Sequence, residues 1–177
     1  YCSPHNPGAS ELMAEVVETL NLDEKAVRTT RDPAKLDEST LMLIYTTSRS
    51  WRGDAREPFA REITIALQTG LRIALAHETP GLGGQQERHA VAFESFVGST
   101  SSASTPRKLI DLGLFQRIAT PLKGGEYRTC SLVMLVMSLQ KLMTAAPRPI
   151  QRSLSESITH TIKARSPATN RAGAPAT

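Results

Sequence analysis

Apolar residues recur along this chain with two different periods, and the order of these periods predicts the elements of the fold. An apolar run at residues 41–45 is followed by a polar stretch, by a segment with helical periodicity at 59–70 and by a second apolar run at 71–76. Two short apolar runs joined by a helix are typical of a βαβ unit, whose strands are parallel. We therefore expect a parallel sheet.

The segment before this unit extends the alternation. Four apolar residues recur at helical spacing between residues 11 and 20, which predicts a helix at 11–20 with Ser10 as its N-cap. Residues 26–30 are expected to form a short edge strand, which Pro33 then ends because proline removes a backbone donor.

The segment after the unit continues in the same way. The pattern predicts helices at 87–96 and 107–112, a strand at 115–122 and a strongly apolar helix at 126–143. Thr105 is expected to cap the second of these helices, with Pro106 at its first position, and Gly113 is expected to end it.

Because strands and helices alternate, the expected fold class is α/β: a three-layer α/β/α sandwich around a mostly parallel, flavodoxin-like sheet. Such a sheet needs a strand before the first helix, and residues 1–3 can supply at most the end of it. We therefore expect either an incomplete sheet or a strand supplied by sequence outside these 177 residues. Since the sequence begins at Tyr1 and not at Met, we also expect a fragment of a longer protein.

The chain is expected to hold one domain and a tail. Residues 1–145 carry the alternating pattern, and a chain of 177 residues suits one domain with a substantial core. From residue 146 onward proline, serine, threonine, alanine and arginine dominate. This composition predicts a weak helix at 151–164 and disorder at 165–177.

Composition argues against several classes of function. The net charge of +4 comes from 21 basic and 17 acidic residues spread along the chain, and aromatic residues make up 5 %. No basic stripe is interleaved with aromatics, so we expect no nucleic-acid partner. The longest apolar candidate, 130–139, is far shorter than the roughly 18 residues of a membrane span, so we expect none.

The sequence holds two cysteines, Cys2 and Cys130. They cannot form a disulfide framework, which favours a reduced, cytoplasmic location. Cys130 falls in the apolar segment at 126–143, and we expect it to be buried there.

Polar side chains follow the predicted strands at their carboxyl ends. Ser48, Arg49 and Trp51 come after the first strand of the βαβ unit, and His77 follows the second. Ligands of open α/β sheets bind at this edge, so we expect these four residues to contact a nucleotide. The first three also have a structural interpretation: Ser48 and Arg49 belong to an ordinary loop, and Trp51 anchors packing.

A metal site and a phosphate-binding loop are the other kinds of site considered at this edge. His77, Glu78 and His89 have irregular spacing and lack a second clear carboxylate, so we expect no metal site. The glycine-rich loop at 81–84 would allow backbone N–H groups to approach a phosphate. Neither a Gly-Lys-Ser/Thr motif nor a dinucleotide fingerprint accompanies it, and this possibility stays open.

Residues 40–76, and within them 59–73 above all, resemble the TIR (Toll/interleukin-1 receptor) domain family, in particular its NAD-cleaving branch. Members have a strand ending in Ser, a loop with Trp, a helix with Glu and then Ala-Leu, and a strand entered through Gly. The matching positions here are Ser48, Trp51, Glu62, Ala66, Leu67 and Gly70. The resemblance implies a flavodoxin-like fold, a role in signalling and self-association with other TIR-like domains.

In the enzymatic members, the glutamate matched by Glu62 is the catalytic residue of nicotinamide release. The resemblance implies this role for Glu62, with NAD as the substrate and no separate cofactor. The chemistry needs one carboxylate, because breaking the N-glycosidic bond builds positive charge on the ribose that a carboxylate stabilises. Nicotinamide is already cationic in NAD, so it needs no general acid and no metal to leave.

The alternative is a non-catalytic TIR-like interaction module of a larger protein. Residues 31–40 are too short for the long loop and second helix that usually precede the third strand in the family, and an incomplete sheet binds a nucleotide poorly. A third interpretation is a fold that binds a nucleotide or sugar phosphate at residues 81–84. Glu62 also has a structural interpretation, as a solvated helix residue that pairs with Arg56 or Arg61.

Overall fold

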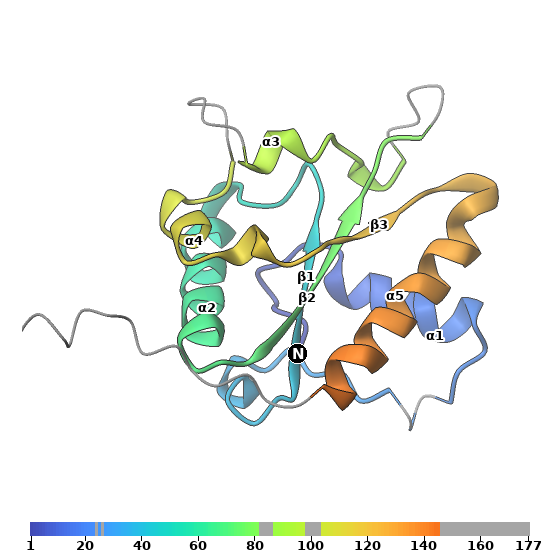
Figure 1. The fold of residues 1–177 in the computed structure, drawn as a ribbon, viewed down its shortest axis with the longest axis horizontal. Helices are drawn as coiled ribbons and strands as arrows, with labels where there is room; N and C mark the ends of the chain where they lie inside the picture. Colours follow the sequence, from blue (N-terminus) through green and yellow to red (C-terminus); the bar gives the residue numbers. More distant parts are fainter. Residues whose placement is uncertain (24, 26, 82–86, 98–103, 146–177) are drawn as a thin grey trace, which may run out of the picture.

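The computed structural model describes residues 1–23, 25, 27–81, 87–97 and 104–145 and contains a parallel sheet (Figure 1). Its strands are β1 (Leu41–Thr46), β2 (Arg72–Glu78) and β3 (Thr120–Leu122), in the order β1-β2-β3. All the pairings are parallel, with Leu41 opposite Arg72 and Ala76 opposite Thr120. The predicted α/β class and the predicted βαβ unit are confirmed.

The first residues of the chain extend the sheet beside β1. Cys2 forms an isolated parallel bridge with Leu43, and the backbone N–H of Leu43 donates to the carbonyl of Tyr1 at 2.9 Å. On its other side, the N–H of Cys2 donates to the carbonyl of Thr30 at 2.9 Å. Residues 1–3 therefore occupy the place of the end of a first strand. Residues 27–30 form no strand, so the expected edge strand is wrong for this described part.

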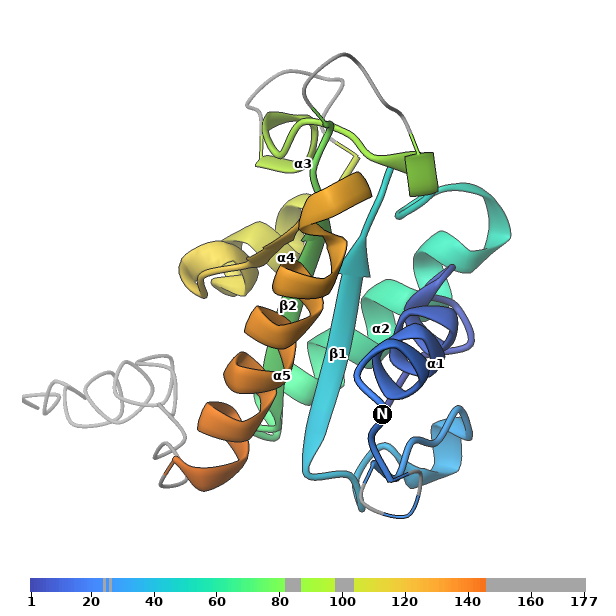
Figure 2. The same cartoon turned by 90° about the vertical axis from the view of Figure 1, so that its right-hand side faces the viewer.

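Helices cover both faces of the sheet, as Figures 1 and 2 show. Helices α1 (Ala9–Thr19) and α5 (Arg128–Thr144) lie on one face, and α2 (Arg56–Gln68) and α4 (Arg107–Asp111) lie on the other. A short helix, α3 (Glu94–Val97), lies beyond the carboxyl end of the sheet. This arrangement is consistent with the expected flavodoxin-like sandwich.

Alternate strand residues supply the two halves of the core, because successive side chains of a strand point to opposite faces. The half under α2 and α4 includes Met42, Ile44, Ile73 and Leu75 with Phe59, Ile63 and Leu109 from the helices. The half under α1 and α5 includes Leu43, Tyr45, Ala74 and Ala76 with Leu12, Val16, Leu132 and Leu135. The apolar residues thus form two core layers, one on each face of the sheet, and these layers hold the helices against it.

Helix α1 begins earlier than its pattern predicted. It starts at Ala9, and its N-cap is Gly8 with a φ of 86°, so the expected capping by Ser10 is wrong. Glycine suits this position for two reasons. A positive φ strains other residues, and a Cβ on Gly8 would lie 2.9 Å from Cε1 of the buried Tyr45 ring.

The expected helix at 87–96 is wrong for most of its length. Glu87–His89 is a 3₁₀ segment, and Arg88 and His89 have φ values of 57° and 59°. An α-helix cannot pass through two residues in the left-handed region, so the chain becomes helical again only at α3. Apolar spacing gave no sign of this backbone reversal.

Two later elements also differ from the expected ones. The strand predicted at 115–122 is reduced to β3, because Leu114–Gln116 forms a 3₁₀ turn before it. Pro106 and not Thr105 is the N-cap of α4, while Gly113, with a φ of 80°, follows the end of that helix as expected. The tail at 146–177 and residues 82–84 of the glycine-rich loop lie outside the described residues.

Helix α5 is the strongly apolar helix that the pattern predicted, but its apolar residues are not all buried. Leu132 and Leu135 face the core, whereas Cys130 is exposed, so its expected burial is wrong. The helix is apolar nearly all round, and only one side of it meets the sheet. Within the described residues, no helix combines the length and hydrophobicity needed to cross a membrane.

Candidate functional site

The carboxyl ends of the parallel strands gather at one edge of the sheet, where open α/β sheets bind their ligands. The loop after residue 3, the loop after β1 and the end of β2 all reach this edge. Ser48, Arg49 and Trp51 lie in the second of these loops, and His77 is the last but one residue of β2. Glu62 lies in the middle of α2.

Glu62 is buried, with 8 % of its surface exposed, so its structural interpretation as a solvated helix residue is wrong. One carboxylate oxygen, Oε1, lies 3.7 Å from Nε2 of His5. The other, Oε2, is buried and has no hydrogen-bond partner among the described residues. An unpaired buried carboxylate oxygen costs free energy in a folded protein, so such an atom calls for an explanation.

Tyr1, in the segment that lies beside β1, covers Glu62. Its hydroxyl is buried and also lacks a hydrogen-bond partner of good geometry among the described residues. Burial, and then the negative charge of the nearby Glu62, raise the pKa of the Tyr1 phenol. Tyr1 is therefore a neutral phenol at physiological pH, and a carboxylate, a phenol and the His5 imidazole meet on one side of α2.

Trp51 joins the loop after β1 to the same helix. Its ring stacks on Phe59, with the centroids 4.7 Å apart, and the residue is 4 % exposed. Phe59 precedes Glu62 by nearly one helical turn. The backbone of Trp51 has a φ of 64°, and its indole N–H is buried without a partner in the described part of the chain. Trp51 is therefore a packing anchor that also carries an unused donor.

His77 lies in an aromatic cluster. Its ring contacts Phe93 and Phe96 edge to face, at centroid distances of 5.3 and 5.5 Å, and its Nδ1 lies 3.1 Å from Oγ1 of Thr46. Burial lowers the pKa of this imidazole, so it is neutral at physiological pH. Nε2 of His77 is buried and without a partner among the described residues.

Ser48 and Arg49 have different surroundings. The backbone N–H of Ser48 donates to the carbonyl of His89 at 2.7 Å, which ties the loop after β1 to the turn at 87–89. The side chain of Arg49 is exposed and lines a cavity of about 350 Å³ at the carboxyl edge. Glu62, Trp51 and His77 do not line this cavity. The structure thus separates Arg49 from the other predicted residues.

The cavity lies between the start of α1 and the loop after β1. Its lining comprises Pro7, Gly8, Glu11, Leu12, Glu15, Tyr45, Thr47, Arg49, Arg88, His89 and Arg128. A second cavity, of about 380 Å³, lies at the opposite end of the strands and is lined by residues 36–37, 40 and 69–72. Position favours the first cavity as a ligand site, because it opens at the carboxyl ends of the strands.

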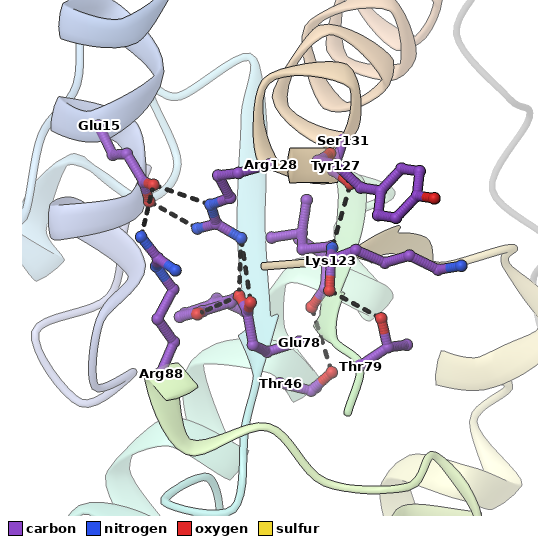
Figure 3. Close-up of polar contacts among 12 residues, drawn as sticks. Glu15, Thr46, Glu78, Thr79, Arg88, Lys123, Tyr127, Arg128 and Ser131 are labelled. Atoms are coloured by element: carbon purple, nitrogen blue, oxygen red, sulfur yellow. Dashed lines mark hydrogen bonds and ion pairs between the residues drawn. The ribbon is translucent and has the colours of Figure 1, made fainter. Parts of the chain in front are cut away.

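Figure 3 shows a network of charged side chains, of which Glu15, Arg88 and Arg128 also line the first cavity. The guanidinium of Arg128 donates to both oxygens of Glu78 at 3.0 Å, and its Nε donates to Glu15 at 2.8 Å. Tyr45 donates its hydroxyl proton to Glu78 at 2.7 Å, and Arg88 contacts Glu15 at 3.3 Å. The network therefore links α1, the strands β1 and β2, and α5.

Hydrogen bonding in this network sets the protonation of its members. The hydrogen bond from Arg128 is the main cause of a lowered pKa at Glu15. Burial, followed by the hydrogen bond to Glu78, raises the pKa of Tyr45. The carboxylate of Glu15 is thus held ionised and the phenol of Tyr45 neutral, which keeps their contacts intact at neutral pH.

This network was not predictable from the sequence. Glu78 was recognised at the end of a strand, but Glu15 and Arg128 lie 63 residues before it and 50 residues after it. One signal was present: Arg128 begins an apolar helix, and a lone charged residue at such a position is often paired. Nothing in the spacing, however, identifies its partners.

No family model, curated protein or solved structure matches this chain. What the structure itself shows is an α/β domain in which a three-stranded parallel sheet is flanked by helices.

Proposed function

We propose that this chain is a TIR-like signalling domain that hydrolyses NAD to nicotinamide and ADP-ribose, with Glu62 as its catalytic carboxylate. The proposal starts from the resemblance of residues 59–73 to the NAD-cleaving TIR branch. The parallel sheet with helices on both faces is compatible with it. The end of a first strand at Cys2 also supports it, because that strand precedes the first helix in a flavodoxin-like sheet.

The observation that supports the proposal is the buried Oε2 of Glu62, which makes no hydrogen bond of good geometry among the described residues although the hydroxyl of Tyr1 lies near the carboxylate. Three of the five predicted site residues, Glu62, Trp51 and His77, hold a buried polar atom that has no partner among the described residues. Polar atoms of this kind are uncommon in folded proteins, and a bound ligand is one way to satisfy them. A ribose hydroxyl would donate to Oε2 of Glu62, and a carbonyl or phosphate oxygen would accept from the indole of Trp51.

In this mechanism Glu62 acts on the ribose. The C–N bond breaks with its electron pair going to nicotinamide, and the carboxylate of Glu62 stabilises the positive charge that develops on the sugar. Water then adds to the same carbon and loses a proton to the solvent. Because Tyr1 and His5 cover Glu62, the substrate has to displace the loop after residue 3 before it reaches the carboxylate.

Nicotinamide release from NAD by the purified chain tests this function. We expect release by the wild-type chain and its loss in Glu62→Gln, which keeps the size of the side chain and removes its charge. Activity that Glu62→Gln leaves unchanged would remove the catalytic assignment.

A second candidate is a non-catalytic interaction module, and the surface of α5 favours it. Val133, Met134, Met137 and Met143 are between 42 % and 63 % exposed. No charged residue lies between Arg128 and Lys141 in this helix, which is unusual for a solvated helix surface. Light scattering over a concentration series tests it, and a strictly monomeric chain that binds no partner segment would count against it.

A further inference from the structure

The cavity at the carboxyl edge has the size and position of a small-molecule site. Its volume of about 350 Å³ falls in the range of ligand pockets, roughly 300–1,000 Å³. It opens beside the start of α1 and the loop after β1, on the side of the sheet that α1 and α5 cover. It does not include Glu62, so it is separate from the proposed site of NAD cleavage.

Charge pairing leaves one cation and one anion for a ligand. The positive charge of Arg128 is taken up by Glu78 and Glu15, and Glu15 also contacts Arg88. Arg49 and Glu11 are exposed, and neither side chain has an ion-pair partner among the described residues. The lining contains three arginines and two glutamates, and the carboxylate of Glu78 behind Arg128 balances the third arginine, so the charges of Arg49 and Glu11 are the two left unpaired in the described part of the chain.

The start of α1 adds backbone donors to the same cavity. Gly8 and Glu11 line it, and no side chain of the described residues caps this helix of 11 residues. The N–H of Ala9 donates to the carbonyl of Asn6 at 3.2 Å, and the next two N–H groups, of Ser10 and Glu11, have no side-chain cap. Uncapped N–H groups and the positive end of the helix dipole favour an anion.

We propose that this cavity binds a small phosphate monoester, namely a sugar phosphate. The guanidinium of Arg49 and the first turn of α1 contact the phosphate, since a planar fork and backbone N–H groups together suit its oxygens. Glu11 accepts hydrogen bonds from the hydroxyl groups of the sugar. Its negative charge also disfavours a polyphosphate, because Arg49 is the one unpaired cation among the described lining residues. This site does not depend on NAD cleavage.

Calorimetric titration of the full chain with ribose 5-phosphate and with inorganic phosphate, at constant ionic strength, tests the site. Arg49→Gln is expected to weaken ribose 5-phosphate binding about tenfold, the effect of losing one charge-assisted contact. Arg107→Gln is the matched control, because Arg107 is exposed on α4 and pairs with Asp111. This variant should bind like the wild type.

Glu11→Gln separates the two parts of the proposal. It is expected to strengthen the binding of inorganic phosphate several-fold, because a repulsive charge is removed, and to reduce the preference for ribose 5-phosphate over phosphate. Circular dichroism melting checks that all variants are folded. Absence of binding by the wild type, or equal binding by Arg49→Gln and Arg107→Gln, would overturn the site. Equal affinity of the wild type for the two probes would overturn the assignment to a sugar phosphate.

Discussion

Arg128 is the residue whose loss should disturb the fold most, because two carboxylates from different elements depend on it. The side chain of Glu78 is 2 % exposed and would keep a buried charge without its cation. Arg128→Ala is therefore expected to lower the free energy of unfolding by about 3–5 kcal/mol. Urea unfolding measures this loss. Arg107→Ala is the control, because it removes an exposed ion pair with Asp111 and is expected to cost about 0.5 kcal/mol. Equal losses in both variants would contradict the structural role of the network.

The pH dependence of stability should report on Glu15. Its pKa is lowered in the folded chain, chiefly by the hydrogen bond from Arg128, from an ordinary value of 4.5. A carboxylate with a lowered pKa stabilises the fold above pH 4.5, and this contribution is lost as the pH falls through the folded pKa. We expect wild type to be more stable than Glu15→Gln at pH 7, with a difference that shrinks below pH 4.5.

Urea unfolding midpoints of the wild type and of Glu15→Gln, measured from pH 7 to below pH 4.5, test this prediction. His77 also titrates, and its lowered pKa destabilises the fold as the pH falls below 6.5, but it is present in both proteins and cancels in the difference. A difference that does not change with pH would mean that the charge of Glu15 contributes nothing.

The predicted site residues show what sequence reasoning could and could not provide at this scale. The resemblance pointed to Glu62, and the order of elements placed Ser48, Arg49 and His77 at the correct edge of the sheet. Which way each side chain faces depends on packing between distant segments. It was therefore not predictable that Tyr1 and His5 cover Glu62, or that Arg49 lines a cavity that Glu62 does not reach.

At the scale of elements, the start of α1 depends on glycine. Gly8 and Gly53 both have a positive φ, but a Cβ would meet the Tyr45 ring only at Gly8, since nothing lies within 4 Å of Gly53. Gly53→Ala is expected to cost about 1–2 kcal/mol from backbone strain alone. Gly8→Ala is expected to cost a further 1–3 kcal/mol, roughly, because the ring is held by Glu78 and cannot move away freely. Thermal unfolding of both variants measures the difference. Equal costs would show that the Tyr45 ring moves aside freely, which would contradict the prediction.

The success of the sequence predictions also follows from the physics of each element. α2, α5 and the two strands of the βαβ unit carry enough apolar residues in period to be recognised, and their ends were predicted within a few residues. The helix predicted at 87–96 was wrong because Arg88 and His89 adopt left-handed backbone angles, which leave no trace in the apolar pattern. The predicted burial of Cys130 was wrong because α5 is apolar on more sides than the sheet covers.

At the scale of the whole molecule, the exposed side of α5 predicts self-association. Met137 is 63 % exposed in the middle of this uncharged surface, and burial against a second copy would remove it from water. Met137→Glu is expected to shift the chain toward the monomer in light scattering at high concentration. Ile65→Glu, at a 43 % exposed apolar position on α2, is the control and should leave the oligomeric state unchanged. A monomeric wild type would contradict the prediction.

The proposed activity depends on the whole fold, because the sheet brings residues 1–3, the loop after β1 and α2 together around the carboxylate of Glu62. The most direct test compares nicotinamide release from saturating NAD by the wild type, Glu62→Gln and Glu57→Gln, all confirmed as folded. Glu57 is an exposed glutamate in the first turn of the same helix, so its variant controls for the loss of a charge from α2. We predict release by the wild type and by Glu57→Gln and its loss in Glu62→Gln. No release by the folded wild type, or equal release by all three, would contradict the proposed function.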